Sequence, residues 1–193
     1  MKFDIKQQHV VFDGFFQVEK LLIDHQTFAG DMVCGVEREV FRRGEAVGVL
    51  CVDRERRKLV MVEQFRVGCA VANDANPWLI ELVAGIVEPG ERVADVAARE
   101  CFEETGCRPR SLKILHQYWV SPGGSDEKFY LFLALVDSSE CSETAGLETE
   151  HEDIKVHIID FDDAFSRLAS GQINNAMTIL GLQWLMLNQS QLA

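Results

Sequence analysis

The sequence is poor in positive charge. Of its 193 residues, 19 are Lys or Arg and 31 are Asp or Glu, which gives a formal net charge of −12. Nucleic-acid phosphates are bound by clustered basic side chains, so this balance argues against DNA or RNA as the main partner. An anionic substrate would need local help from a few arginines, or from divalent cations held by the surplus carboxylates.

Signals for zinc binding, secretion and membrane insertion are also missing. The six cysteines include no C-x-x-C pair, which argues against a zinc site, and we expect most of them to pack as small hydrophobic side chains. The first residues alternate charged with apolar side chains, unlike a signal peptide. No later run approaches the roughly 20 apolar residues of a membrane span. We therefore expect a soluble, cytoplasmic protein.

Apolar periodicity and turns predict a strand-rich N-terminal segment followed by a larger α/β domain. Turn residues at Asp13-Gly14 and Gly30-Asp31 separate strand-like segments, so we interpret residues 1–45 as an antiparallel ribbon and residues 46–193 as the main domain. In the main domain we expect strands at 46–52, 58–63, 78–85, 113–120, 129–136 and 154–159, and helices at 92–105, 161–169 and 175–187. This order predicts the α/β class, with a mixed sheet covered by helices.

Three glutamates lie on one face of the first expected helix. Glu100, Glu103 and Glu104 are three and four residues apart, so they project within an arc of about 100°. Like charges this close repel unless a cation neutralises them, and ligands that are all oxygen favour magnesium or manganese. Arg99 is placed to orient one of these glutamates or to pair with Glu91.

These residues belong to a longer pattern over residues 85–107. It reads Gly, five residues, Glu, seven residues, Arg-Glu, two residues, Glu-Glu, one residue, Gly and an apolar position. Glutamate pairs on helices are usually solvated surface, but this spacing matches the signature of the Nudix hydrolase family. The resemblance implies an α/β/α sandwich, divalent cations held chiefly by the glutamates, and hydrolysis of a nucleoside diphosphate linked to another group. Cys101 and Cys107 replace the usual aliphatic residues, which affects packing only.

Almost the whole chain resembles the bacterial ADP-ribose pyrophosphatases of that family. This resemblance implies hydrolysis of ADP-ribose to AMP and ribose 5-phosphate, with Pro122 and Gly123 in a turn near the terminal ribose. It also implies a catalytic glutamate in the polar stretch 137–153, which is long for a connection in a compact domain. We carry the general base to Glu150 and a metal contact to Glu152, although the sequence leaves open which of the two is the base.

The same resemblance implies the rest of the site. Two or three Mg²⁺ ions per site, with Mn²⁺ as the alternative, would be held by Ala84 through its carbonyl, Glu100, Glu104 and Glu152. The catalytic residues would be Arg99, Glu103, Glu150 and Glu152. The substrate would be bound by Phe15, Arg38, Arg66, Glu81, Pro122 and Gly123. From the sequence alone, Phe15 is as well explained by strand packing as by stacking on adenine.

The resemblance further implies a homodimer in which N-terminal strands cross onto the partner, and residues 1–45 suit such a domain swap. Three other functions stay open. The first is a pyrophosphatase for another nucleoside diphosphate sugar, such as GDP-mannose. The second is a nucleotide sensor without catalysis, against which the intact set of glutamates argues. The third is an RNA 5′-end hydrolase, for which the acidic sequence predicts no basic groove.

Overall fold

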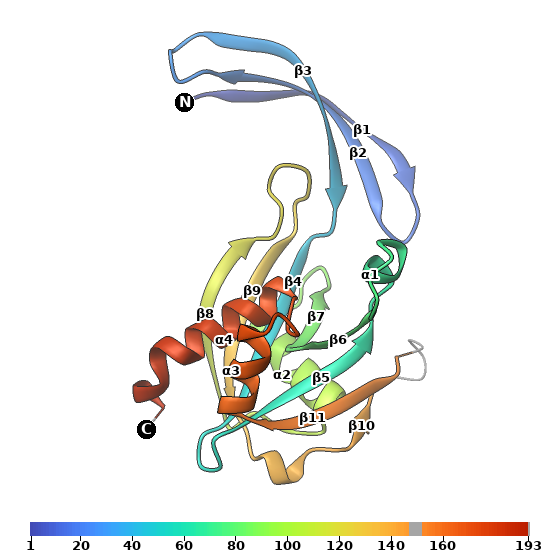
Figure 1. Cartoon of the computed structure of the whole chain (residues 1–193). Helices are drawn as coiled ribbons and strands as arrows, with labels where there is room; N and C mark the ends of the chain where they lie inside the picture. Colours follow the sequence, from blue (N-terminus) through green and yellow to red (C-terminus); the bar gives the residue numbers. More distant parts are fainter. Residues whose placement is uncertain (147–151, 193) are drawn as a thin grey trace. The chain divides into compact units, whose positions relative to one another are not determined.

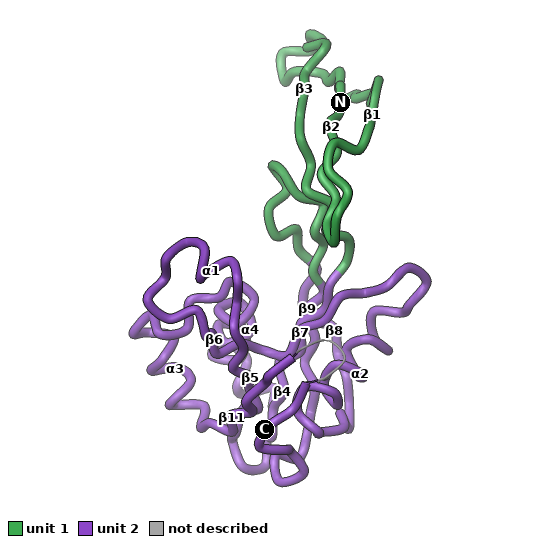
Figure 2. Tube along the Cα trace, turned by 90° about the vertical axis from the view of Figure 1, so that its right-hand side faces the viewer, with its two compact units in different colours: residues 1–45, 118–129 green, residues 46–117, 130–193 purple. Residues whose placement is uncertain are grey.

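The computed structural model describes residues 1–146 and 152–192, which fall into two units (Figure 2). Unit 1 comprises residues 1–45 and 118–129, and unit 2 comprises residues 46–117 and the chain from residue 130 onwards. The chain therefore passes from one unit to the other after residues 45, 117 and 129. The domain boundary expected at residue 45 stays a prediction.

Unit 1 contains the predicted antiparallel ribbon. Its strands are β1 (Phe3–Asp13), β2 (Gln17–Gln26) and β3 (Met32–Arg42), paired in the order β1-β2-β3 (Figure 1). Of the residues in these three strands only Leu21 is buried. The ribbon consequently has almost no hydrophobic core of its own.

Residues 118–129 are held to the end of β3 by main-chain and ionic contacts. The Phe41 amide donates to the Gly124 carbonyl at 2.8 Å, and Asp126 Oδ1 accepts from the Arg43 amide at 2.6 Å. The Arg43 guanidinium pairs with Glu127 at 3.0 Å. Two segments far apart in sequence thus form one unit.

Unit 2 is built on an eight-stranded sheet. Its main path has the order β10-β11-β5-β4-β9-β8, while β6 pairs with β5 and β7 with β4. The strands are β4 (Glu45–Asp53), β5 (Lys58–Phe65), β6 (Trp78–Glu81), β7 (Val83–Val87), β8 (Ser111–Trp119), β9 (Lys128–Leu135), β10 (Thr144–Ala145) and β11 (Ile154–Asp160). The helices are α1 (Val67–Val71), α2 (Val93–Thr105), α3 (Phe161–Ala169) and α4 (Ala176–Asn188), with 3₁₀ turns at Ser138–Glu140 and Gln189–Gln191.

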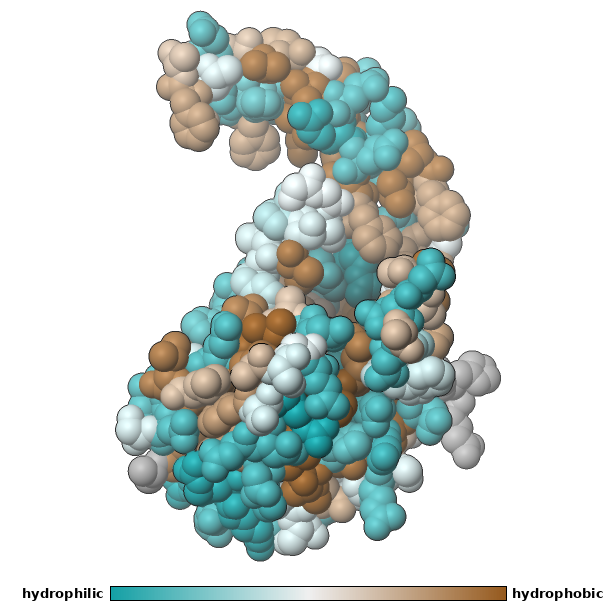
Figure 3. Space-filling model, in the orientation of Figure 1, coloured by the Kyte–Doolittle hydropathy of each residue, from teal (hydrophilic) through white to brown (hydrophobic). Residues whose placement is uncertain are grey.

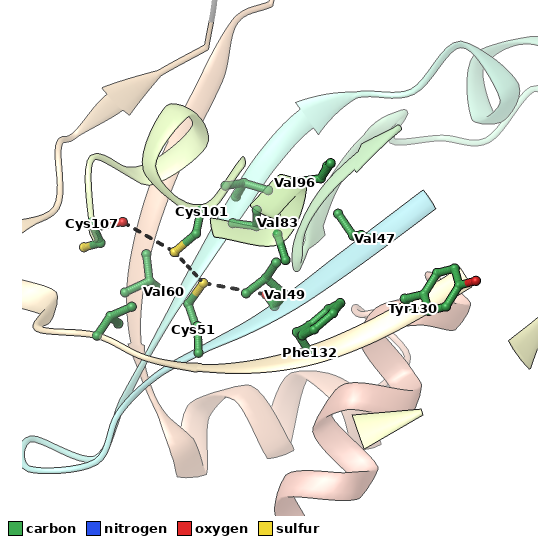
Figure 4. Close-up of a cluster of buried hydrophobic side chains, with 14 of the residues drawn as sticks. Val47, Val49, Cys51, Val60, Val83, Val96, Cys101, Cys107, Tyr130 and Phe132 are labelled. Atoms are coloured by element: carbon green, nitrogen blue, oxygen red, sulfur yellow. Dashed lines mark hydrogen bonds between the residues drawn. The ribbon is translucent and has the colours of Figure 1, made fainter. Parts of the chain in front are cut away.

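Alternation along the central strands divides the core between two faces of this sheet. Val49 and Cys51 of β4 pack in one buried cluster with Cys101 of α2 (Figure 4). Leu50, which lies between them in sequence, points to the opposite face, where Gly181 of α4 approaches it. Helices therefore cover both faces, and the predicted α/β class with a mixed sheet is confirmed.

The structure differs from the sequence-based expectation at several short elements, which include strand β10, the two 3₁₀ turns, the strands β6 and β7, and helix α1. The apolar run 78–85 is divided into β6 and β7 at Leu82, whose amide donates to the Thr178 hydroxyl at 3.1 Å and not to a strand. Helix α1 was not predicted, because its five residues carry no amphipathic period. No helix among the described residues has the length and apolar character needed to cross a bilayer.

The cysteines partly differ from the expectation. Cys51 and Cys101 are buried with their sulfur atoms 3.5 Å apart, as small packing residues should be. Cys107 and Cys141 instead form a disulfide, with Cα atoms 5.0 Å apart, which joins the end of α2 to the segment before β10. Their separation of 34 residues contains no motif that predicts this pairing.

Candidate active site

Helix α2 supplies two of the four candidate metal ligands, Glu100 and Glu104, and the packing of one face and the residue at its C-terminus explain its position. Its buried face includes Ala97 and Cys101, small side chains that allow close approach to the sheet. It ends at Gly106, whose φ of 76° is left-handed and suits glycine. The Glu91 carboxylate accepts from the Glu88 amide at 2.9 Å and so stabilises the turn before the helix.

Glu104 is the most deeply placed of the glutamates. Its residue exposure is 3%, and its Oε2 accepts from the Ala84 amide at 3.2 Å. Burial raises the pKa of Glu104 well above its usual value, and the charges of Glu100 and Glu152 raise it further. The positive charge of Arg66 acts in the opposite direction. Two other carboxylates and one guanidinium of unit 2 are thus within electrostatic reach of Glu104.

Glu100 lies directly over Gly85 of β7. A Cβ atom on Gly85 would overlap the Glu100 carboxyl group, so only glycine admits this side chain here. Arg99 forms ion pairs with two of the glutamates: its Nη1 is 3.0 Å from the Glu100 carboxylate and 2.9 Å from the Glu103 carboxylate. Its Nη2 is 3.8 Å from Glu91, so the structure brings Arg99 to both partners that the sequence suggested.

Glu152 is the last candidate ligand within the described residues. Its Oε1 accepts from the Gln64 side chain of β5 at 3.3 Å, a contact that no sequence pattern indicated. Glu150, to which we carried the general base, lies outside the described residues. Its role stays a prediction.

The donor set fits a hard divalent cation by its chemistry. A buried carboxylate surrounded by other carboxylates has an uncompensated cost of ionisation, which a cation with oxygen ligands removes. Among residues 1–146 and 152–192, no three Asp, Glu, His or Cys side chains already converge at coordination distance. The assignment of Ala84, Glu100, Glu104 and Glu152 as ligands therefore stays a prediction that rests on proximity and charge.

Two of the expected substrate residues, Arg66 and Glu81, lie together in unit 2. Arg66 follows β5, Glu81 ends β6, and Arg66 Nε donates to Glu81 Oε2. Burial raises the pKa of Glu81, while the Arg66 charge lowers it. Asn175 donates to the other Glu81 oxygen. Sequence reasoning missed Asn175, because a contact across 94 residues leaves no local signal.

The other four expected substrate residues lie in unit 1. Phe15 is 87% exposed and meets Phe16 edge to face, with ring centroids 4.7 Å apart. Arg38 is on β3, and its Nη1 donates to the Glu37 carbonyl at 2.8 Å. Pro122 and Gly123 are exposed in the turn that follows β8. Their roles in binding stay predictions.

Comparison with known proteins identifies the family. The family model described as NUDIX domain matches residues 42–178. The chain belongs to the NUDIX domain family and is a hydrolase of that family, whose enzymes generally use divalent metal ions.

Individual relatives of known activity are more informative than the family model, because their names state substrates. An ADP-ribose pyrophosphatase of Haemophilus influenzae is 39% identical over 98% of this chain and 88% of its own length. An ADP-ribose pyrophosphatase of Escherichia coli (strain K12) is 37% identical, covering 98% and 90%. A GDP-mannose pyrophosphatase of Cronobacter sakazakii is 31% identical, covering 95% of each chain. A solved structure titled as that of an ADP compounds hydrolase has the same fold, with a TM-score of 0.74, 20% identity and coverage of 99% and 96%.

Proposed function

We propose that this Nudix hydrolase cleaves the pyrophosphate bond of ADP-ribose with one water molecule, giving AMP and ribose 5-phosphate. The observation that carries the proposal is the buried Glu104 carboxylate, beside Glu100 and Glu152, in a chain similar over almost its full length to ADP-ribose pyrophosphatases. The related GDP-mannose pyrophosphatase supports the alternative that another nucleoside diphosphate sugar is the substrate.

The metal assignment is part of this proposal. Glu100, Glu104 and Glu152, with the Ala84 carbonyl, would hold two or three Mg²⁺ ions, or Mn²⁺ in their place. When bound, such ions neutralise the charge of a diphosphate and lower the pKa of a coordinated water.

The side chains of this protein have separate tasks in the proposed reaction. Arg99 orients Glu100 and Glu103 through ion pairs of 3.0 and 2.9 Å. The Arg66 guanidinium binds a diphosphate oxygen, because its planar donors match such oxygens. Glu150 accepts the proton of the attacking water.

Four residues of unit 1 belong to the proposed substrate contacts. In this proposal Phe15 stacks on the adenine and Arg38 contacts the nucleotide. Pro122 and Gly123 bring main chain to the terminal ribose.

A homodimer and a cytoplasmic location complete the proposal. Apolar side chains gather on the surface of the ribbon (Figure 3), and those more than one third exposed include Phe3, Ile5, Val10, Val11, Phe12, Phe28, Met32 and Val33. A monomer would leave this patch in water, whereas a second copy that exchanged N-terminal strands would cover it. Residues 1–45 would then be the dimerisation segment.

A substrate panel combined with one variant tests the proposal. The wild type should have a higher kcat/KM for ADP-ribose than for GDP-mannose, with Mg²⁺ present. Glu104→Gln should lose most turnover and melt no lower than the metal-free wild type, because it removes a charged ligand and keeps an oxygen that can accept from the Ala84 amide. Asp95→Asn is the matched control, since Asp95 is an exposed acid in the first turn of the same helix. Binding of ADP-ribose without turnover would favour the sensor, and near-normal Glu104→Gln rates at saturating Mg²⁺ would contradict the metal assignment.

A further inference from the structure

The Glu81 carboxylate lies between two side chains that are distant in sequence. Its Oε2 accepts from Arg66 Nε, and its Oε1 accepts from Asn175 Nδ2. The Glu81 side chain is only 2% exposed, so water cannot readily replace either partner. Both carboxylate oxygens are therefore engaged by groups of the protein itself.

We propose that Asn175 is a positioning residue for Arg66: it holds the Glu81 carboxylate in place, and Glu81 in turn orients the Arg66 guanidinium toward the carboxylates of α2. This inference deepens the proposed function and rests on it. It gives Glu81 a positioning role, in place of the direct substrate contact that the family resemblance implies.

Arg66 is placed so that its free donors are available to an anion. Its main-chain amide donates to the Pro77 carbonyl at 2.8 Å, which anchors the backbone after β5. The bond to Glu81 uses only Nε, and within the described part of the chain neither terminal nitrogen makes a hydrogen bond or an ion pair. The Arg66 charge acts on Glu104, so the guanidinium is within electrostatic reach of the candidate metal ligands.

Residue 175 must both accept a hydrogen bond at the start of α4 and donate one to Glu81, and an asparagine side chain can do both. Its Oδ1 accepts from the Thr178 amide at 3.1 Å and caps the N-terminus of α4. Its Nδ2 donates to Glu81. Serine and aspartate are equally good caps, but neither offers a side-chain N–H that could reach Glu81.

The first turns of α4 are fastened to the β6–β7 junction at two further points. The Thr178 hydroxyl accepts from the Leu82 amide at 3.1 Å, and Gly181 leaves room for the Leu82 side chain. Neither contact uses Asn175 Nδ2, and the Thr178 hydroxyl itself donates to Asn175 Oδ1 at 3.2 Å, a role that a serine oxygen can take over. A substitution at residue 175 can therefore change the Glu81 contact while the helix stays in place.

The test compares Asn175→Ser with Asn188→Ser. The first variant keeps a capping hydroxyl and loses the donor to Glu81. The second is the matched control at the far end of α4, where the Asn188 amide donates to the Trp184 carbonyl at 2.8 Å. We expect Asn175→Ser to lower kcat/KM for ADP-ribose about tenfold, mainly through KM, as for loss of a hydrogen bond to a charged group. Asn188→Ser should match the wild type.

A double-mutant cycle separates positioning from a general defect. If Asn175 acts through Arg66, then Asn175→Ser should cost less than about twofold in an Arg66→Ala background. An independent readout is the ¹⁵N–¹H signal of Arg66 Nε, identified by its absence in Arg66→Lys. This signal should be sharp in the wild type and shifted or broadened in Asn175→Ser.

The possible outcomes test separately the link from Asn175 to Arg66, the positioning role of Asn175 and the proposed function. An unchanged Nε signal in Asn175→Ser overturns the link whatever the activity. A changed signal with wild-type kcat/KM, or an equal loss in the Arg66→Ala background, overturns the positioning role. A wild type that leaves ADP-ribose intact contradicts the proposed function, whereas the signal still decides whether Asn175 fixes Arg66.

Discussion

A single methyl group at residue 85 should disable the site without unfolding the protein. Gly85 lies on β7 under the Glu100 carboxyl group, and a Cβ atom built there overlaps that group. The overlapping atoms belong to the outer part of a flexible side chain and not to the backbone. Gly85→Ala should therefore be accommodated by rotation of Glu100 away from its present position.

The geometry sets the size of the effect. Carbon atoms in contact are about 3.5–4.0 Å apart, so the Glu100 carboxyl group must move by on the order of 1 Å or more. A misplacement of about 1 Å in a catalytic site can cost roughly 100-fold in rate. Alanine reduces the conformational freedom of the unfolded chain, which contributes about 0.4–1 kcal/mol and offsets part of the strain. We expect a fall of about 100-fold in kcat with a nearly unchanged melting temperature.

Three measurements check this expectation. Initial rates with ADP-ribose give kcat, calorimetry with Mg²⁺ or Mn²⁺ gives metal affinity, and thermal melting gives stability. Gly68→Ala is the matched control, because a Cβ at Gly68 meets nothing within 4 Å. Wild-type turnover and metal affinity in Gly85→Ala would refute the reasoning that Glu100 needs this close approach.

Further predictions concern pH and stability. Burial, and then the Glu100 charge, raise the pKa of Glu104 in the folded state above its unfolded value. The contribution of Glu104 to the free energy of unfolding is therefore fully present below about pH 4.3 and declines at higher pH. Metal-free wild type should lose up to about 1.4 kcal/mol per pH unit from that value up to the folded-state pKa of Glu104, and Glu104→Gln should not; equal profiles in calorimetric melts would contradict this. Burial opposes ionisation of Asp53, but hydrogen bonds from Ser138 and the following turn lower its pKa overall. Asp53→Asn should thus cost about 1–3 kcal/mol in urea unfolding near neutral pH, with a smaller difference below about pH 4. Cys141→Ser should cost about 2–4 kcal/mol under oxidising conditions and nothing with dithiothreitol present; a difference that persists in reductant would exclude the disulfide as its cause.

The local part of the site is predictable from the sequence. Glu100, Glu103 and Glu104 share one helical face because of their spacing alone, and the structure places Arg99 beside the first two. The end of α2 at Gly106 follows from the same local logic, since a left-handed residue there favours glycine. Such features depend on neighbours within a few residues.

The non-local part is not predictable in this way. The Asn175 contact to Glu81, the Gln64 contact to Glu152 and the Cys107–Cys141 disulfide join segments that meet only after folding. Each uses common polar residues or cysteine, with no motif that distinguishes them from surface or core positions. The division of the 78–85 run into two strands depends on the Thr178 hydroxyl, which likewise lies far along the chain.

Because unit 1 is assembled from two stretches of sequence, it cannot be excised by trimming one terminus. Deletion of residues 1–45 would strip Asp126 and Glu127 of the Arg43 groups that they bind. The turn carrying Pro122 would remain attached but unsupported. A shortened protein should accordingly lack both stretches together, and inactivity after a simple N-terminal deletion would not by itself reveal a role for the first strands.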